Sequence, residues 1–213
     1  SQPMYPLTAV NIAAEDYVEG PLENFCRGAL RLDPAFKSYA TLANARLDAP
    51  LVRSLPNGPR HDKGSANEDV TFAGPDLRNA EIHASDFLIE AYVQAGSDGL
   101  IIGKKGGPGY RLEIKGGKAL FSLEGQDGSR AELASKATLS DGKWHHLLVE
   151  ADRAAATLTI HVDGRRDAAG KGLGPVSLAN DADLFVGGTP QGDHLAGSLE
   201  FLRIALCTLA GAE

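Results

Sequence analysis

Carboxylates are the residues of this chain with the clearest capacity for chemistry, because 28 Asp and Glu are spread over 213 residues. Hydrolysis of a glycosidic bond by two carboxylates needs a general acid and a second carboxylate held across the scissile bond. The nearest acidic cluster is Glu81, Asp86 and Glu90. Side chains alternate between the two faces of a strand, so this spacing does not place all three on one face. We therefore expect no two-carboxylate active site at this cluster.

The stretch 44–85 leaves one route to such a site open. Seven Pro and Gly residues interrupt it, and it carries Asp62, Glu68, Asp69 and Asp76. A connection this long is usually functional or mobile. It is the natural place for binding that is specific to this protein, or else a meander over one sheet face. Two of its carboxylates could converge from loops, and this is the way in which the chain could still be an enzyme.

Motifs of other enzyme classes are missing from the sequence. There is no G-x-S-x-G nucleophile elbow and no H-E-x-x-H zinc motif. The Gly-rich run 103–109 lacks the G-K-[ST] ending of a phosphate-binding loop, so it is expected to be a hairpin turn. His145 and His146 are adjacent and face opposite sides of a strand, which prevents them from binding one metal together. Trp144 begins the same strand and is expected in the core rather than as a sugar-stacking platform.

The charge balance excludes some classes of partner. The net charge is -7, with 28 acidic against 21 basic side chains, and no block of like charge stands out. Nucleic acids and anionic membrane surfaces are bound through basic patches, so neither is expected as a partner. No run of about 18 apolar residues is present, which argues against insertion into a membrane. A removed signal peptide would leave no trace in this sequence.

The most informative stretch is 140–164, which predicts a β-hairpin. A polar turn at 140–142 leads into an apolar strand from Trp144 to Ala151. The return strand alternates, with Leu158, Ile160 and Val162 on one face and Thr157, Thr159 and His161 on the other. Asp163-Gly164 then forms the next turn, where Gly can adopt a positive φ without steric cost.

Short strands are predicted along the rest of the chain, and no segment has a sustained period of 3.6 residues. Residues 15–24 and the Gly-rich stretch 168–175 are expected to be loops. The predicted strands are 5–12, 25–33, 39–43, 69–73, 87–94, 100–103, 110–114, 119–124, 130–134, 183–187 and 199–209. All-β chains of about 200–250 residues commonly form one domain. We expect a single domain over 1–213, with 1–24 as an N-terminal extension and 44–85 as an insertion.

These motifs together resemble the laminin-G-like, concanavalin A-like sandwich domains. The pattern D-G-x-W-H-H, an apolar strand, a short turn and L-x-I-x-V-D-G is shared with that family, as is the ending G-S-L-E-F-L-R-I at 197–204. The segments G-A-L-R-L-D at 28–33 and F-L-I-E-A-Y-V at 87–93 are similar to two further family strands. The resemblance covers about residues 25–209, with 44–85 unmatched. It implies an all-β fold, a two-sheet antiparallel jelly-roll sandwich.

The resemblance also implies candidate residues for calcium and for a disulfide. Asp33 and Glu200 fall at positions that can bind calcium in relatives, although Pro34, Ser38 and Phe201 depart from the family pattern. Asp181 and Asp183 are further candidate ligands. In this fold the first and last core strands are expected to be antiparallel neighbours. That arrangement would bring Cys26 and Cys207 together as a disulfide and indicate an oxidising compartment, whereas two buried thiols are the alternative.

Glycoside hydrolases that share this fold, the laminarinase relatives, carry Glu-x-Asp-x-x-Glu on one strand, and this chain has no such triplet. Two hypotheses remain for the function. The first is a non-catalytic recognition module for a carbohydrate or protein ligand, belonging to an extracellular, periplasmic or cell-surface protein. The second is a carbohydrate-active enzyme, a glycoside hydrolase or lyase-like protein with an unrecognised site. A spacer within a longer chain would show neither a groove nor a ligand. The sequence leaves the oligomeric state open.

Overall fold

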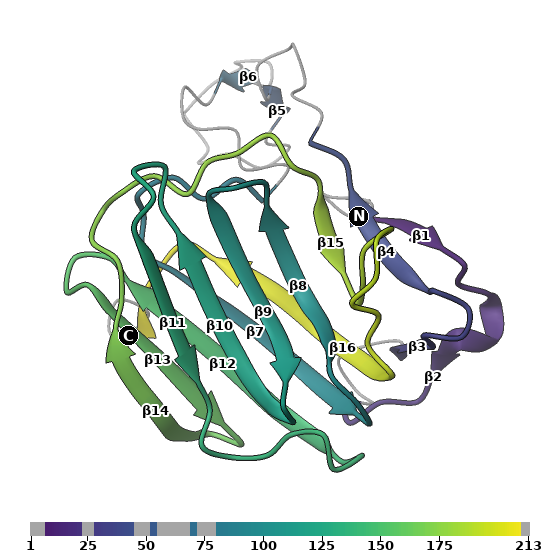
Figure 1. Ribbon diagram of the computed structural model, residues 1–213. Coiled ribbons are helices and arrows are strands. Elements are labelled where there is room, and N and C mark those ends of the chain that lie inside the picture. The colour runs from purple at the N-terminus through teal and green to yellow at the C-terminus, as the bar shows by residue number, and fades with distance from the viewer. Residues whose placement is uncertain (1–6, 23–27, 45–51, 55–68, 72–79, 210–213) are drawn as a thin grey trace, which may run out of the picture.

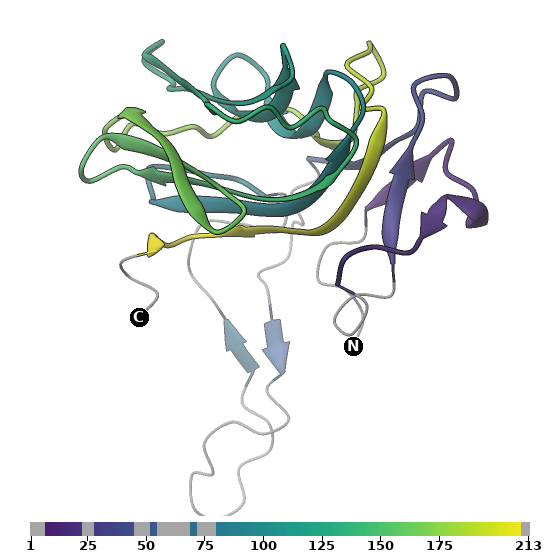
Figure 2. The same cartoon turned by 90° about the horizontal axis from the view of Figure 1, so that it is seen from below.

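The computed structural model describes residues 7–22, 28–44, 52–54, 69–71 and 80–209, and their strands form two seven-stranded antiparallel sheets (Figure 1). Sheet A has the order β1-β4-β15-β8-β9-β10-β11, and sheet B has the order β14-β13-β12-β7-β16-β3-β2. The two sheets are stacked as layers (Figure 2). This arrangement confirms the predicted all-β sandwich.

Each sheet takes strands from several parts of the chain, with β8 to β11 consecutive in sheet A and β12 to β14 consecutive in sheet B. In sheet A they are β1 (Thr8–Val10), β4 (Tyr39–Leu42), β8 (Gly99–Lys105), β9 (Gly109–Lys115), β10 (Lys118–Glu124), β11 (Arg130–Ala134) and β15 (Leu184–Val186). In sheet B they are β2 (Tyr17–Val18), β3 (Ala29–Leu32), β7 (Phe87–Ala95), β12 (Trp144–Asp152), β13 (Thr157–Val162), β14 (Arg165–Lys171) and β16 (Gly197–Ala205). A single 3-10 turn, η1, covers Ala14–Asp16. A separate pair, β5 (Val52–Ser54) and β6 (Asp69–Thr71), lies apart from both sheets (Figure 2).

The predicted hairpin is present as β12 and β13, in the register Leu147↔Val162 to Asp152↔Thr157. Leu158 and Ile160 are fully buried, as the alternation predicted. The turn that follows contains Asp163 and Gly164, both with positive φ. β12 also pairs with β7, so the hairpin joins the centre of sheet B and fixes which of its residues face outwards.

The core lies between the two sheets and is apolar. Sheet B supplies Phe87, Ile89 and Val149, and sheet A supplies residues such as Leu112 and Phe121, all fully buried. The Phe87 ring packs edge-on against the Phe121 ring with 5.9 Å between centroids. Burying one such side chain stabilises the fold by roughly 1.5–3 kcal/mol, which makes this alternation the main determinant of the strand registers.

Two loop predictions are wrong. Residues 168–171 continue β14, because the tight Asp163-Gly164 turn returns the chain against β13 and the charged, small residues suit an edge strand. Residues 17–18, predicted as loop, form β2 and pair with β3, while β1 pairs with β4. The described part of the N-terminal extension therefore adds one short edge strand to each sheet. The described residues contain no helix long and apolar enough to cross a membrane.

Candidate binding surface

The outer face of sheet B, which points away from the core, carries a cluster of aromatic and charged side chains. The registers of β12, β7 and β16 place Trp144 beside Gln94, His146 beside Tyr92, and Arg203 beside Glu90. These residues alternate with the buried ones of the same strands, so they share the outward face. We call the following set the aromatic face: Glu90, Tyr92, Trp144, His146, Phe201 and Arg203.

Glu90 joins the polar members of the aromatic face. Its Oε1 lies 2.8 Å from His146 Nε2, and its Oε2 accepts a hydrogen bond from Arg203 Nη2 at 2.5 Å. The His146 ring stacks on Tyr92 with 4.8 Å between centroids and an angle of 29° between planes. The side chain of Arg203 remains 51% exposed. The carboxylate therefore holds an imidazole and a guanidinium in fixed positions while the guanidinium stays open to solvent.

Phe201 is the most unusual residue of the aromatic face. It lies where the register of β16 against β7 shifts between Glu200 and Arg203, and its φ is 51°. A bulky residue with positive φ is a steric outlier that costs on the order of 1–3 kcal/mol and persists only where its surroundings enforce it. The residue is 40% exposed, and the centroid of its ring lies 5.8 Å from the Arg203 guanidinium carbon. The bulge thus presents an aromatic ring beside an exposed cation.

Trp144 lies on this face and not in the core, so the sequence-based prediction for it is wrong. The residue is half-buried, and its register partner Gln94 also faces outwards. Leu147 and Val149 point inwards on β12, and the alternation then turns Trp144 outwards. The position of Trp144 at the start of β12 therefore did not predict its burial, whereas its separation from the inward-pointing residues of the same strand does predict the face on which it lies.

The two adjacent histidines point to opposite sides of sheet B, as predicted. His146 belongs to the aromatic face, whereas His145 Nδ1 lies 2.9 Å from Asp163 and its Nε2 lies 3.1 Å from Asp141. Burial by itself lowers the pKa of His145, but the hydrogen bonds to Asp163 and Asp141 outweigh it and raise the pKa above its ordinary value. His145 therefore links the turn before β12, which contains Asp141, to the turn after β13, which contains Asp163.

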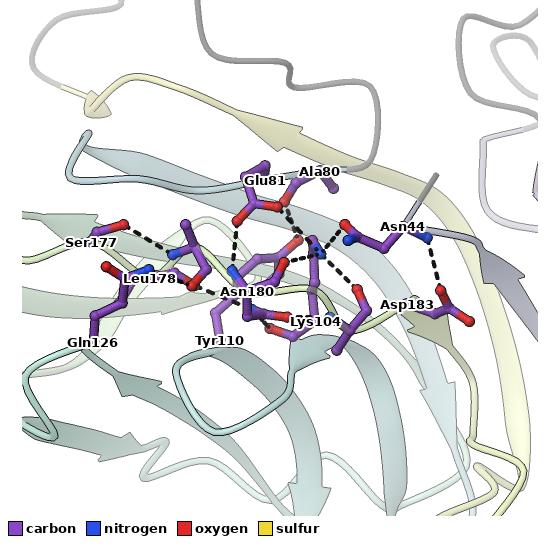
Figure 3. A network of polar contacts seen from close by, with 12 residues as sticks. Asn44, Ala80, Glu81, Lys104, Tyr110, Gln126, Ser177, Leu178, Asn180 and Asp183 are labelled. Atoms are coloured by element: carbon purple, nitrogen blue, oxygen red, sulfur yellow. Dashed lines mark hydrogen bonds and ion pairs between the residues drawn. The ribbon is translucent and has the colours of Figure 1, made fainter. Parts of the chain in front are cut away.

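A second polar cluster surrounds Lys104 at the end of β8 and is buried (Figure 3). Lys104 is 1% exposed, and its Nζ donates to Asn44 Oδ1 at 2.8 Å and to the carbonyls of Asn180 and Ala182 at 3.0 and 2.6 Å. Glu81 Oε2 lies 3.5 Å from the same nitrogen. Burial lowers the pKa of Lys104, and Glu81 offsets only part of this effect.

The Lys104 cluster joins both ends of the segment between β4 and β7. Asn44 follows β4, and Glu81 precedes β7; Glu81 Oε1 accepts from the backbone N–H of Asn180 at 2.7 Å. Tyr110, also buried, donates from its hydroxyl to the carbonyl of Ala80 at 3.0 Å. All the amine protons of Lys104 have acceptors, so this cluster is a clamp that fixes loops to the sandwich and has no donor left for a ligand.

An open groove of about 830 Å³ lies on another side of the molecule, between the β10–β11 hairpin and the segment 171–176. The 1% exposed Arg153 holds the far wall, since its guanidinium donates to the carbonyls of Leu173, Gly174 and Val176. Asp86 accepts from the backbone N–H of Arg153. The groove is lined by Asp127, Ser129, Arg130, Ala131, Glu132, Ala156, Lys171, Gly172, Leu173, Gly174, Pro175 and Val176.

The predicted calcium ligands do not come together. Asp33 Oδ1 accepts from the N–H of Ala35 in the turn after β3, and Glu200 Oε2 accepts from the N–H of Leu22. β3 and β16 pair in the register Gly197↔Leu32 to Leu199↔Leu30, which places the two carboxylates beyond opposite ends of this pairing. Asp183 accepts from the N–H of Asn44. Among the described residues no group of three or more His, Cys, Asp or Glu could hold a metal ion, so the described side chains do not fit a calcium site and calcium stays a prediction.

The three carboxylates of the acidic cluster, Glu81, Asp86 and Glu90, make separate contacts in the structure. Glu81 pairs with Lys104, Asp86 bonds the backbone of Arg153, and Glu90 holds the aromatic face together. The side chains of the carboxylates at 62, 68, 69 and 76 lie outside the part of the chain that the structure describes, so their convergence is untested.

The predicted disulfide also involves a residue outside the described ranges, Cys26. Cys207 follows β16, is partly buried and forms no disulfide with a described residue. β3 and β16 are antiparallel neighbours, as the prediction assumed. The Cys26–Cys207 bond itself stays a prediction.

Comparison with solved structures finds the same fold in other proteins at low sequence identity. The binding domain of paraclostridial mosquitocidal protein 1 aligns with a TM-score of 0.66 and 11% identity over 98% of this chain and 45% of that one. Domains LG4-5 of the mouse laminin α1 chain align with a TM-score of 0.51 and 18% identity, over 64% of this chain and 40% of that one. The Ruminococcus gnavus IT-sialidase CBM40 bound to α2,3 sialyllactose aligns with a TM-score of 0.50 and 16% identity, over 60% of this chain and 79% of that one. This chain thus spans less than half the length of the first two.

A search among curated protein sequences gives no match. A family model of laminin G type, described as the concanavalin A-like lectin/glucanases superfamily, matches residues 67–213. The matched segment contains β6 to β16 and therefore most strands of both sheets. Since the match covers more than half of the sequence and agrees with the two-sheet sandwich, this chain belongs to the concanavalin A-like lectin/glucanase superfamily.

Proposed function

We propose that this chain is a non-catalytic recognition module that binds a glycan on the aromatic face. The observation that carries the proposal is Phe201, an aromatic ring held outwards by a strained bulge beside the exposed Arg203. Sugar rings offer apolar C–H faces that pack on aromatic rings, and their hydroxyl groups accept hydrogen bonds from a guanidinium. Strain of this kind gathers at binding and catalytic sites, because it is retained only where it is useful.

The polar groups of the aromatic face are suited to binding more than to hydrolysis. Glu90 already bonds His146 and Arg203, and the nearest outward carboxylate on β16, Glu200, is 3% exposed. Hydrolysis by two carboxylates needs both of them accessible across one bond. A protein ligand is the other candidate, since Trp, Tyr and Arg also anchor protein interfaces. The strands that present these residues are central in sheet B, which makes the surface preformed.

A glycan array, run beside a reducing-sugar release assay on the same polysaccharides, tests this function. We expect binding of at least one glycan class and no release of reducing sugar. Turnover that disappears when one carboxylate is replaced by its amide would show an enzyme and overturn the proposal. Failure to bind any glycan, together with specific capture of a protein, would also overturn it.

The same proposal places the module on an exported or cell-surface protein, with a Cys26–Cys207 disulfide. The antiparallel pairing of β3 with β16 supports the disulfide, because in such a pair the start of one strand lies beside the end of the other, and Cys26 precedes β3 while Cys207 follows β16. A bridge requires Cα atoms about 4.4–6.8 Å apart. The chain-entropy model gives a bridge across so long a loop roughly 5 kcal/mol, which native strain usually reduces. We expect non-reducing peptide mapping of native protein to recover a linked Cys26–Cys207 peptide. Recovery of both thiols in free form would contradict the disulfide without touching the glycan site.

A further inference from the structure

β11 is an edge strand whose outer side is unpaired within the described part of the chain. It ends the order of sheet A and pairs with β10 alone, in the register Leu120↔Ala134 to Glu124↔Arg130. An unpaired edge presents a row of backbone N–H and C=O groups that can hydrogen-bond another strand. The open groove runs beside this edge, so there is space next to it.

The register fixes which residues present these groups. Ser135 N donates to the carbonyl of Ala119, and Gly125 N donates to the carbonyl of Ser129, both at 2.8 Å. Residues of an antiparallel strand bond alternately to one side and the other. The odd-numbered residues of this strand therefore bond to β10. The backbone groups of Arg130, Glu132 and Ala134 point away from the sheet, towards the free edge.

The side chains at this edge have a charge pattern that complements itself. Arg130 and Glu132 are exposed and flank Ala131, which is buried. The tripeptide is therefore basic, apolar, acidic. An antiparallel strand that matches it must place an acidic residue against Arg130 and a basic residue against Glu132. Read in its own direction, that strand is again basic, apolar, acidic.

We propose that β11 pairs with β11 of a second copy of this chain, in a symmetric antiparallel register centred on Ala131. In this register Arg130 lies opposite the partner's Glu132, and each such pair exchanges two backbone hydrogen bonds at the free edge. Shifting the strands by two residues to the neighbouring symmetric registers places Arg130 against Arg130 or Glu132 against Glu132. Like charges directly opposite each other are destabilising, so the charges select one register.

A second copy fits this edge better than an unrelated strand does. Two-fold symmetry is the commonest symmetry of protein dimers, and it requires a surface that complements itself. The charge pattern of β11 meets this requirement, because both charge pairs form between two copies of one sequence. Arg130 Nη2 already bonds Glu124 at 2.8 Å, so the partner's carboxylate would complete a three-membered ion network. The two sheets A would then become one continuous sheet. The alternative is that the charges only protect the edge from pairing, and this is one outcome of the test.

Sedimentation velocity over a concentration series, from low micromolar upwards, tests the pairing with charge-reversal variants. We expect the wild-type chain to dimerise and both Arg130→Glu and Glu132→Arg to sediment as monomers, with dimerisation weakened at least about tenfold because each change sets two like-charged pairs opposite each other. The double variant Arg130→Glu/Glu132→Arg restores complementary pairs and should dimerise again. Lys118→Glu, at the exposed first residue of β10, gives the same net-charge change as Arg130→Glu and should leave dimerisation unchanged.

A mixture of the two single variants gives the most specific result. One of them carries two acidic residues at the edge and the other two basic residues, so the mixture should form a heterodimer although each variant alone is monomeric. Circular dichroism of each variant shows whether it is folded. A wild-type chain that stays monomeric at the highest concentration, or a dimer that the reversals do not weaken, would overturn the proposal. Neither result would bear on the glycan site.

Discussion

The Lys104 cluster and the aromatic face are each built around a cation and a carboxylate, yet they differ in what is left unpaired. Lys104 is 1% exposed, and its amine has acceptors in Asn44, Asn180 and Ala182. Arg203 is 51% exposed, and of its guanidinium nitrogens only Nη2 bonds a described residue, Glu90. A buried, saturated cluster stabilises the fold, whereas a half-exposed one with spare donors and a strained neighbour can bind. Whether all hydrogen-bond donors of a cluster are satisfied therefore distinguishes a structural cluster from a candidate binding surface.

The largest effect is expected from Lys104→Met, which would test the structural side of this comparison. The substitution leaves Glu81 and three other acceptors buried without their donor, and breaking a buried pair in this way costs about 3–5 kcal/mol. Urea unfolding measures the loss. Lys105→Met is a matched control, because Lys105 is 38% exposed and its ion pair with Glu124 is worth at most about 1 kcal/mol. Equal stabilities of the two variants would show that the Lys104 cluster is not a clamp.

An intermediate effect is expected at Phe201, and it would test the strain. Phe201→Ala and Phe201→Gly both remove the ring, so they differ in backbone preference alone. Because φ is 51°, we expect the Gly variant to be more stable than the Ala variant by about 1 kcal/mol. At an ordinary strand position the order is reversed, and Ala91 of β7 supplies that control through Ala91→Gly. An Ala variant that is as stable as the Gly variant would remove the strain argument.

The smallest effect is expected at His145, whose ring lies on the side opposite the aromatic face. Its hydrogen bonds to Asp163 and Asp141 raise its pKa above the ordinary 6.5, after outweighing burial. A raised pKa in the folded state means that its contribution to stability is complete below the unfolded pKa and is lost as pH rises through the folded pKa. Urea unfolding at about pH 5 and about pH 8.5 should therefore show a difference between wild type and His145→Gln that shrinks as pH rises through the histidine range. A difference that does not change with pH would contradict this role.

The sequence predicted the sandwich well because its strands follow a period of two around an apolar core. The same alternation places Tyr92 and Gln94 on the face of Glu90, and His146 on the face of Glu150. It did not predict the bulge at Phe201, since a register shift depends on how β16 packs against β7 over many residues. One signal was present: Phe201 occupies a position where the resemblance led us to expect an acidic residue. The Lys104 cluster was unpredictable, because residues near 44, 81, 104 and 180 are far apart in the sequence and meet only once β4, β8 and β15 have paired in sheet A.

The edge strand at 165–171 was missed for a related reason. Its charged and small residues carry no apolar alternation, and its pairing is imposed by the Asp163-Gly164 turn and by β13. The calcium and disulfide predictions depended on the family resemblance, and Cys26 of the predicted disulfide lies outside the described ranges. Elemental analysis, together with melting curves measured with and without a chelator, tests whether the protein binds calcium.

The most direct test of the central claim is calorimetric titration of a glycan found on the array into wild type, Phe201→Ala and Phe36→Ala. Phe36 is a matched control, because it is 69% exposed on the turn after β3 and lies outside the aromatic face. Our account predicts that Phe201→Ala weakens binding at least about tenfold, as loss of a central aromatic anchor does, and that Phe36→Ala binds as wild type does. A folded Phe201→Ala variant with wild-type affinity would contradict it.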